Sequence, residues 1–131
     1  MHRRTGIVAA LVVAAAFVTG CSGPSIRFTQ TAGIPTWATL ADTTSGEPQA
    51  FAHDHELAIV TWGSSSCPPT PTAIDPGVVP VITFEMTKHE ICTADMAPTS
   101  FVFPAAELGG SVPSRVTVKI DVHEYDLAVA G

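Results

Sequence analysis

The sequence predicts an all-β fold, a small β-sandwich or open barrel. Several short segments alternate apolar and polar residues with a period of two, as half-buried strands do. Eleven prolines and ten glycines fall largely between these segments and leave little room for helix. Short strands separated by such turn residues are typical of β-sandwiches and barrels. Only the segment from Pro104 to Leu108 is compatible with a helical turn.

Three of the expected strands lie in the middle of the chain. Glu56–Trp62 is apolar on both alternating faces, which predicts a central strand covered on both sides. Val81–Met86 alternates and directs every second residue from Ile82 to Met86 into the core. Ser100–Phe103 places two aromatic rings on one side and ends at Pro104.

The clearest alternation lies near the C-terminus. From Val116 to Val122 every second residue is β-branched, which predicts four inward side chains separated by polar, outward ones. From Tyr125 onward the apolar residues occupy odd positions instead. This change of phase requires a turn or bulge near His123–Glu124, so we expect a hairpin or a bent strand there.

The N-terminus has the features of an export signal. Two basic residues, Arg3 and Arg4, precede an apolar run, Ile7–Val18, which is shorter than the roughly 20 residues needed to span a bilayer. The next residues complete Val18–Cys21, which resembles the lipobox read by the lipoprotein signal peptidase. This resemblance implies removal of residues 1–20 and lipid on Cys21. An ordinary secretory signal, with Cys21 incidental, and a twin-arginine signal are the alternatives.

These features predict three regions in the chain. Residues 1–20 form the signal, residues 21–50 a lipid-attached tether and irregular segment, and residues 51–131 the β domain. We therefore expect the protein to be anchored by lipid at the extracytoplasmic face of the cell membrane, which makes the membrane its first partner. Two acyl chains give a stable anchor, where one would be marginal.

The composition of the expected mature chain excludes some partners. Of the six basic residues, two lie in the signal, so four remain beside all twelve acidic residues, a formal net charge of −8. Nucleic acid requires a basic face that releases counterions, so we expect no nucleic-acid partner. The same charge disfavours a second, polybasic contact with the membrane.

Two cysteines remain if Cys21 carries lipid. Cys67 and Cys92 form an even pair in an exported chain, so we expect a disulfide between them. A loop of this length gives roughly 3–4 kcal/mol of stabilisation in the chain-entropy model. A metal site or a reactive thiol is the alternative reading, although the chain contains no C-x-x-C motif.

Chemistry-bearing motifs are few. His53 and His55 flank an aspartate and would face the same way in a strand, so they are weak metal-ligand candidates. Four further residues could add metal ligands: His89, His123, Met86 and Met96. Their spacing does not match that of periplasmic copper carriers. Ser65 lacks the full G-x-S-x-G context of a hydrolase. We expect no catalytic residues, no cofactor and no enzymatic activity.

Two short motifs carry a further resemblance. The segment Gly63–Pro68 reads GSSSCP, and Cys92–Asp95 reads CTAD. Together they resemble small secreted proteins and lipoproteins of actinobacteria. This resemblance implies an exported β domain with the Cys67–Cys92 bond, and no activity.

The expected role is that of a non-enzymatic binding or interaction module, with an envelope protein as its candidate partner. Binding residues concentrate on loops, and Ser64–Pro76 and Ala105–Ser114 are the long ones expected here. The alternatives are a metal-binding lipoprotein that uses His53 and His55, and a small hydrolase.

Overall fold

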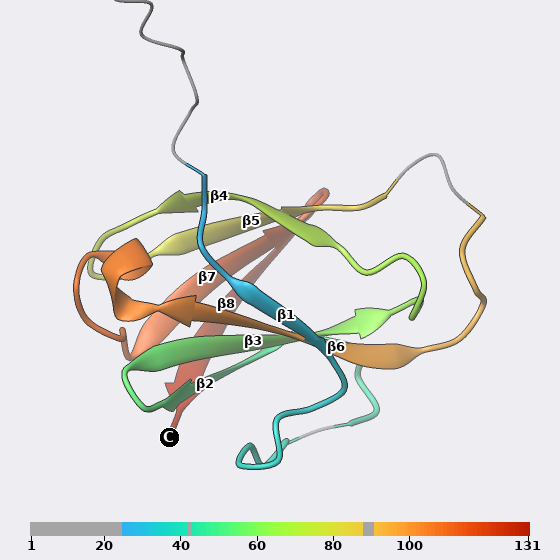
Figure 1. The fold of residues 1–131 in the computed structure, drawn as a ribbon, viewed down its shortest axis with the longest axis horizontal. Coiled ribbons are helices and arrows are strands. Elements are labelled where there is room, and N and C mark those ends of the chain that lie inside the picture. Colours follow the sequence, from blue (N-terminus) through green and yellow to red (C-terminus); the bar gives the residue numbers. More distant parts are fainter. Residues whose placement is uncertain (1–24, 42, 88–90) are drawn as a thin grey trace, which may run out of the picture.

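The structure, a computed structural model, describes residues 25–41, 43–87 and 91–131 (Figure 1). Cys21, the expected signal and His89 lie outside the described residues. The described part contains eight strands and one short 3-10 helix: β1 (Thr29–Ala32), β2 (Gln49–His53), β3 (Glu56–Gly63), β4 (Thr70–Asp75), β5 (Val81–Glu85), β6 (Ala97–Pro104), η1 (Ala105–Leu108), β7 (Arg115–Ile120) and β8 (His123–Ala130).

The strands form one curled sheet in the order β1-β6-β3-β2-β8-β7-β5-β4. The curl gives a half-barrel with β1 and β4 at its two edges (Figure 1). Neighbouring strands are antiparallel except for β2 with β8 and β5 with β7, which are parallel. The predicted all-β fold with one disulfide is confirmed, and it takes the form of an open barrel.

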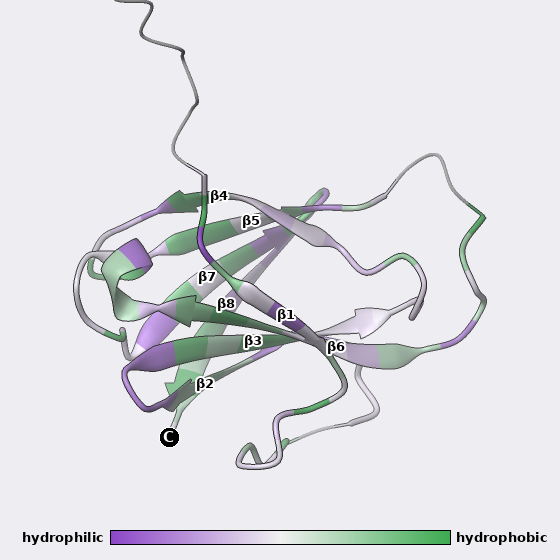
Figure 2. Ribbon diagram, in the orientation of Figure 1, coloured by the Kyte–Doolittle hydropathy of each residue, from purple (hydrophilic) through white to green (hydrophobic). Residues whose placement is uncertain are grey.

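The main core fills the inside of the curl. It combines the inward apolar residues of β3, β5, β6 and β7, and Figure 2 shows these strands as largely hydrophobic. Phe84 of β5 and Phe101 of β6 meet at a ring distance of 5.1 Å and an angle of 70°. Such edge-to-face pairs contribute about 0.5–1.5 kcal/mol beyond their area. This contact joins the two halves of the sheet across the interior.

A smaller core lies on the outer face of the sheet. Phe51, Ala58 and Val60 point away from the main core and are covered by Ala38 and Leu40 of the segment between β1 and β2. β3 is therefore buried on both faces, as its sequence predicted.

Two strands begin in the segment expected to be irregular. All four residues of β1 pair with β6, and β2 starts at Gln49. The sheet therefore includes residues before position 51, although the stretch between β1 and β2 has no strand.

The expected turn after Pro104 is the 3-10 helix η1. Among the described residues no helix is long and apolar enough to cross a membrane.

The expectation of one long loop over Ser64–Pro76 was wrong, because Thr70–Asp75 is strand β4. The strand was not predicted because its prolines are typical of loops. Pro71 lies inside β4, and the register with β5 shifts between Pro71 and Ala73. Proline removes a backbone donor, so it is tolerated at the edge of a sheet, where β4 lies.

The predicted C-terminal hairpin is confirmed, with its turn two residues earlier than expected. β7 and β8 pair antiparallel, and Asp121 and Val122 connect them. Val122 is 92% exposed, so the prediction that it points inward was wrong. Asp121 has φ 52°, in the left-handed region that aspartate and asparagine tolerate better than most residues.

Candidate functional site

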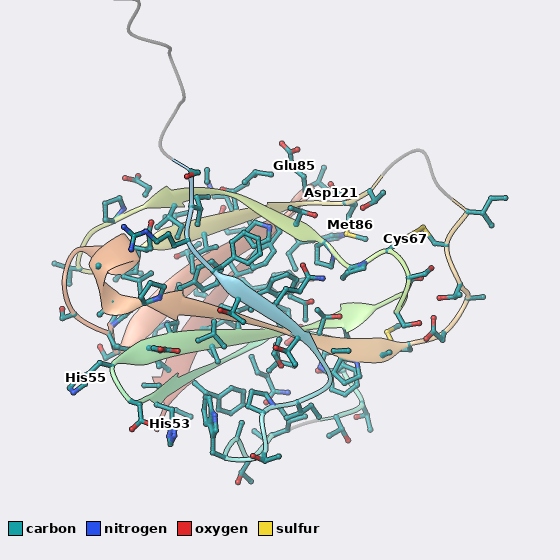
Figure 3. The ribbon with its side chains drawn as sticks, viewed as in Figure 1. His53, His55, Cys67, Glu85, Met86 and Asp121 are labelled. Carbon is teal, nitrogen blue, oxygen red and sulfur yellow. A yellow bond between two sulfur atoms is a disulfide. The ribbon has the colours of Figure 1, made fainter. Side chains whose placement is uncertain are left out.

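A hollow of about 920 Å³ on the described surface is open to solvent. It lies where β4 begins and β5 ends, beside the turn between β7 and β8. Figure 3 shows three of its residues, Glu85, Met86 and Asp121, together at this end of the domain. The hollow is lined by Thr70, Thr72, Thr83, Phe84, Glu85, Met86, Thr87, Asp121 and Val122. Below, we call it the threonine hollow.

The parallel pairing of β5 with β7 brings Glu85 and Asp121 to the same end of the hollow. The last register pair of these strands is Phe84 with Ile120. Glu85 is the last residue of β5, Asp121 is the first residue of the turn after β7, and both are exposed. Because Phe84 is buried, Glu85 points to the opposite, outer face of the sheet. Two like charges therefore share one end of the hollow.

Little positive charge lies nearby in the described part of the chain. Lys119 of β7 is the nearest basic position in the register, between Thr83 of β5 and Glu124 of β8. It therefore has its own carboxylate neighbour across the β7–β8 ladder. No ion pair joins Glu85 or Asp121 to another described side chain. The hollow is thus acidic and lined by no described lysine, arginine or histidine.

Hydroxyl groups and two apolar side chains complete the walls. Thr70 lies directly opposite Glu85 in the β4–β5 register. Thr72 donates its hydroxyl hydrogen to the backbone carbonyl of Thr83 at 3.4 Å. Met86 and Val122 provide apolar surface beside the carboxylates. This set can accept hydrogen bonds, bind a cation and contact a hydrocarbon stem, and it contains no nucleophile–base pair.

His53 and His55 lie at the opposite end of the domain (Figure 3). The expectation that they share one face of a strand was wrong, since β2 ends at His53 and the tight turn to β3 contains Asp54 and His55. Both turn residues have positive φ, 48° and 62°. The chain thus reverses between the two imidazoles.

His53 has its own contacts. Its ring stacks on Trp37 at a centroid distance of 4.4 Å and an angle of 11°. Its Nε2 lies 3.2 Å from a carboxylate oxygen of Asp54. Two smaller hollows, of about 540 and 310 Å³, meet at this residue. The stack attaches the segment between β1 and β2 to the sheet, which gives His53 a structural role.

The remaining metal-ligand candidates are dispersed. Met86 lines the threonine hollow, Met96 is exposed ahead of β6, and His123 begins β8. Among the described residues no group of three or more His, Cys, Asp or Glu side chains could hold a metal ion.

The predicted disulfide is confirmed. The Cα atoms of Cys67 and Cys92 are 5.5 Å apart, within the usual range for a disulfide. Cys67 is buried and Cys92 is exposed, so the bond attaches the loop before β6 to the loop after β3.

Hydrogen bonds reinforce this attachment and involve Ser65, the hydrolase candidate. Its backbone N–H donates to Asp95 at 3.1 Å, and Thr93 also donates to that carboxylate. Hydrogen bonds from Ser65 and then Thr93 lower the pKa of Asp95 to about 2. Ser65 therefore lies beside a stable carboxylate in a structural clamp, rather than beside a general base.

Sequence reasoning missed the threonine hollow. Of the two loops expected to carry function, Ser64–Pro76 supplies two of its threonines through β4, whereas Ala105–Ser114 borders the hollow beside His53. Glu85 and Asp121 looked like ordinary solvated acids in the sequence. Only the parallel pairing of β5 with β7 brings them together.

Comparison with known proteins found no family model, no curated protein and no solved structure that matches this chain.

Proposed function

We propose that this protein is an exported, lipid-anchored interaction domain without catalytic activity, and that a partner binds at the threonine hollow. The observation that carries the proposal is the hollow itself, about 920 Å³ of open surface on the sheet in which threonine hydroxyls and two carboxylates lie beside apolar side chains. Open surfaces that combine polar groups with apolar side chains suit reversible protein contacts, in which a polar rim surrounds a few anchoring side chains.

The chain between the lipid and the domain supports a role at the membrane. Ile26 is the first described residue that packs against the main core. Four residues separate it from Cys21, so five extended peptide units reach about 17 Å. This is close to the roughly 13 Å radius of gyration of a domain of about 100 residues. A partner would therefore meet the domain close to the bilayer, at high local concentration.

The anchor is tested by Cys21→Ala. This variant should not incorporate labelled fatty acid and should leave the membrane fraction, because the lipidated thiol is removed. Labelling of the variant at the wild-type level would refute the lipid anchor.

The site is tested by photo-crosslinking in the native envelope. A photoreactive amino acid at Thr72, inside the hollow, should yield a discrete crosslinked protein. The same probe at Ser45, an exposed residue between β1 and β2, is the matched control and should not yield that species. No crosslink from Thr72, or the same species from both positions, would refute a partner at the hollow.

A further inference from the structure

Building on the proposed function, we infer that the threonine hollow is a socket for a basic side chain, arginine or lysine, on an exposed segment of a partner protein. The occupant follows from charge complementarity, from the apolar wall beside the charges, and from the openness of the hollow.

The charge argument rests on Glu85 and Asp121. They follow the last register pair of two adjacent strands and have no described ion-pair partner. A cation that binds beside them would form charge-assisted hydrogen bonds with their carboxylates. The expected net charge of −8 would also attract basic partners over longer distances. An anionic partner would add to the repulsion.

The apolar part of the hollow suits the aliphatic part of a lysine or arginine side chain. Lysine and arginine carry three or four methylene groups below the charge, and these groups pack on apolar surface while the head stays polar. Met86 and Val122 offer that surface next to the two carboxylates, and Val122 is 92% exposed. The threonine hydroxyls around them can accept the remaining N–H groups of a guanidinium.

The openness of the hollow favours a protein over a free small amine. Small-molecule sites bury most of the surface of their ligand. This hollow is open to solvent, so a free amine bound there would stay largely hydrated. A side chain on a partner protein is supported by further contacts around the rim, and arginine is enriched in such interfaces.

The test measures binding of a fluorescent hexa-arginine peptide to the full-length chain purified in uncharged detergent. Glu85→Gln with Asp121→Asn removes both charges and keeps the shapes, and asparagine tolerates the left-handed backbone of position 121. Glu47→Gln with Glu107→Gln is the control, with the same change of charge away from the hollow. We expect the hollow variant to weaken binding about tenfold and the control variant to leave it within about twofold.

Equal weakening by both variants would show unspecific charge attraction and overturn the inference. Spermidine that binds as tightly as the peptide would also overturn it, in favour of a small amine. The crosslink from Thr72 is then measured in the hollow variant. If that crosslink persists at full yield, the proposed partner-binding role is retained, and the inference that a basic side chain occupies the hollow is refuted. Absence of any crosslink from Thr72 in the wild type would refute the proposed function itself.

Discussion

Glu85 and Asp121 are the first residues beyond the last register pair of β5 and β7, so the parallel pairing of these strands brings two carboxylates to one end of the threonine hollow. Neither has an ion-pair partner among the described side chains. This arrangement of like charges adds no favourable ion pair to the described part of the fold. We therefore interpret it as a binding feature.

The first prediction separates binding from stability at these two positions. Glu85→Gln should leave the free energy of unfolding within about 0.5 kcal/mol of the wild type, because the Glu85 carboxylate is exposed and forms no ion pair with another described side chain. Asp121→Asn should behave in the same way. Urea unfolding followed by circular dichroism measures both. A loss above about 1 kcal/mol would mean that the carboxylates support the fold.

The second prediction concerns the disulfide. Replacing Cys67 and Cys92 together by alanine should cost roughly 2–5 kcal/mol of unfolding free energy, since the loop between them is 25 residues long and the domain is small. The oxidised chain should show no free thiol at these two positions. A double variant as stable as the oxidised wild type would be incompatible with a structural disulfide.

The third prediction uses the pKa of Asp95, which hydrogen bonds from Ser65 and Thr93 lower from 3.8 to about 2. Because the pKa in the folded state is depressed, this stabilisation is complete above about pH 4 and is lost as the pH falls toward 2. Thr93→Val, which keeps the shape but removes the hydroxyl, should raise the pKa toward 3.8. NMR titration of the Asp95 carboxyl measures the midpoint, and an unchanged midpoint in Thr93→Val would contradict the assigned cause.

The fourth prediction concerns the histidines. Because His53 stacks on Trp37 and the chain reverses before His55, we predict no tight metal site at this turn. Calorimetry with Zn²⁺ should show at most weak binding, since a closed zinc site normally takes four ligands. His53→Ala is the control and should bind Zn²⁺ no more weakly than the wild type. A sub-micromolar site lost in His53→Ala would support the metal-binding alternative.

The sequence was sufficient for the parts of the fold that depend on local pattern. The two apolar faces of β3 and the alternation of β7 were predicted because burial repeats every second residue. β4 was missed because Pro68, Pro69 and Pro71 look like a loop, although an edge strand tolerates them. Val122 was misplaced because the alternation continues through the turn that exposes it.

The candidate site was beyond local reasoning. The threonine hollow depends on which strands become neighbours, and the order β8-β7-β5-β4 includes a parallel pair that no local pattern predicts. His53 and His55 stood out in the sequence because of their residue type. In the structure, their positions in a turn determine what they can contact.

Filling the hollow tests the central claim most directly. Thr83→Trp should occupy the space between β4 and β7 without changing any charge, and tryptophan suits a strand. Thr31→Trp, on exposed β1, is the control. With the photoreactive probe at Thr72, we predict that Thr83→Trp abolishes the crosslinked partner and that Thr31→Trp retains it. Equal crosslinking by both variants, each with wild-type unfolding behaviour, would contradict a partner-binding site in the threonine hollow.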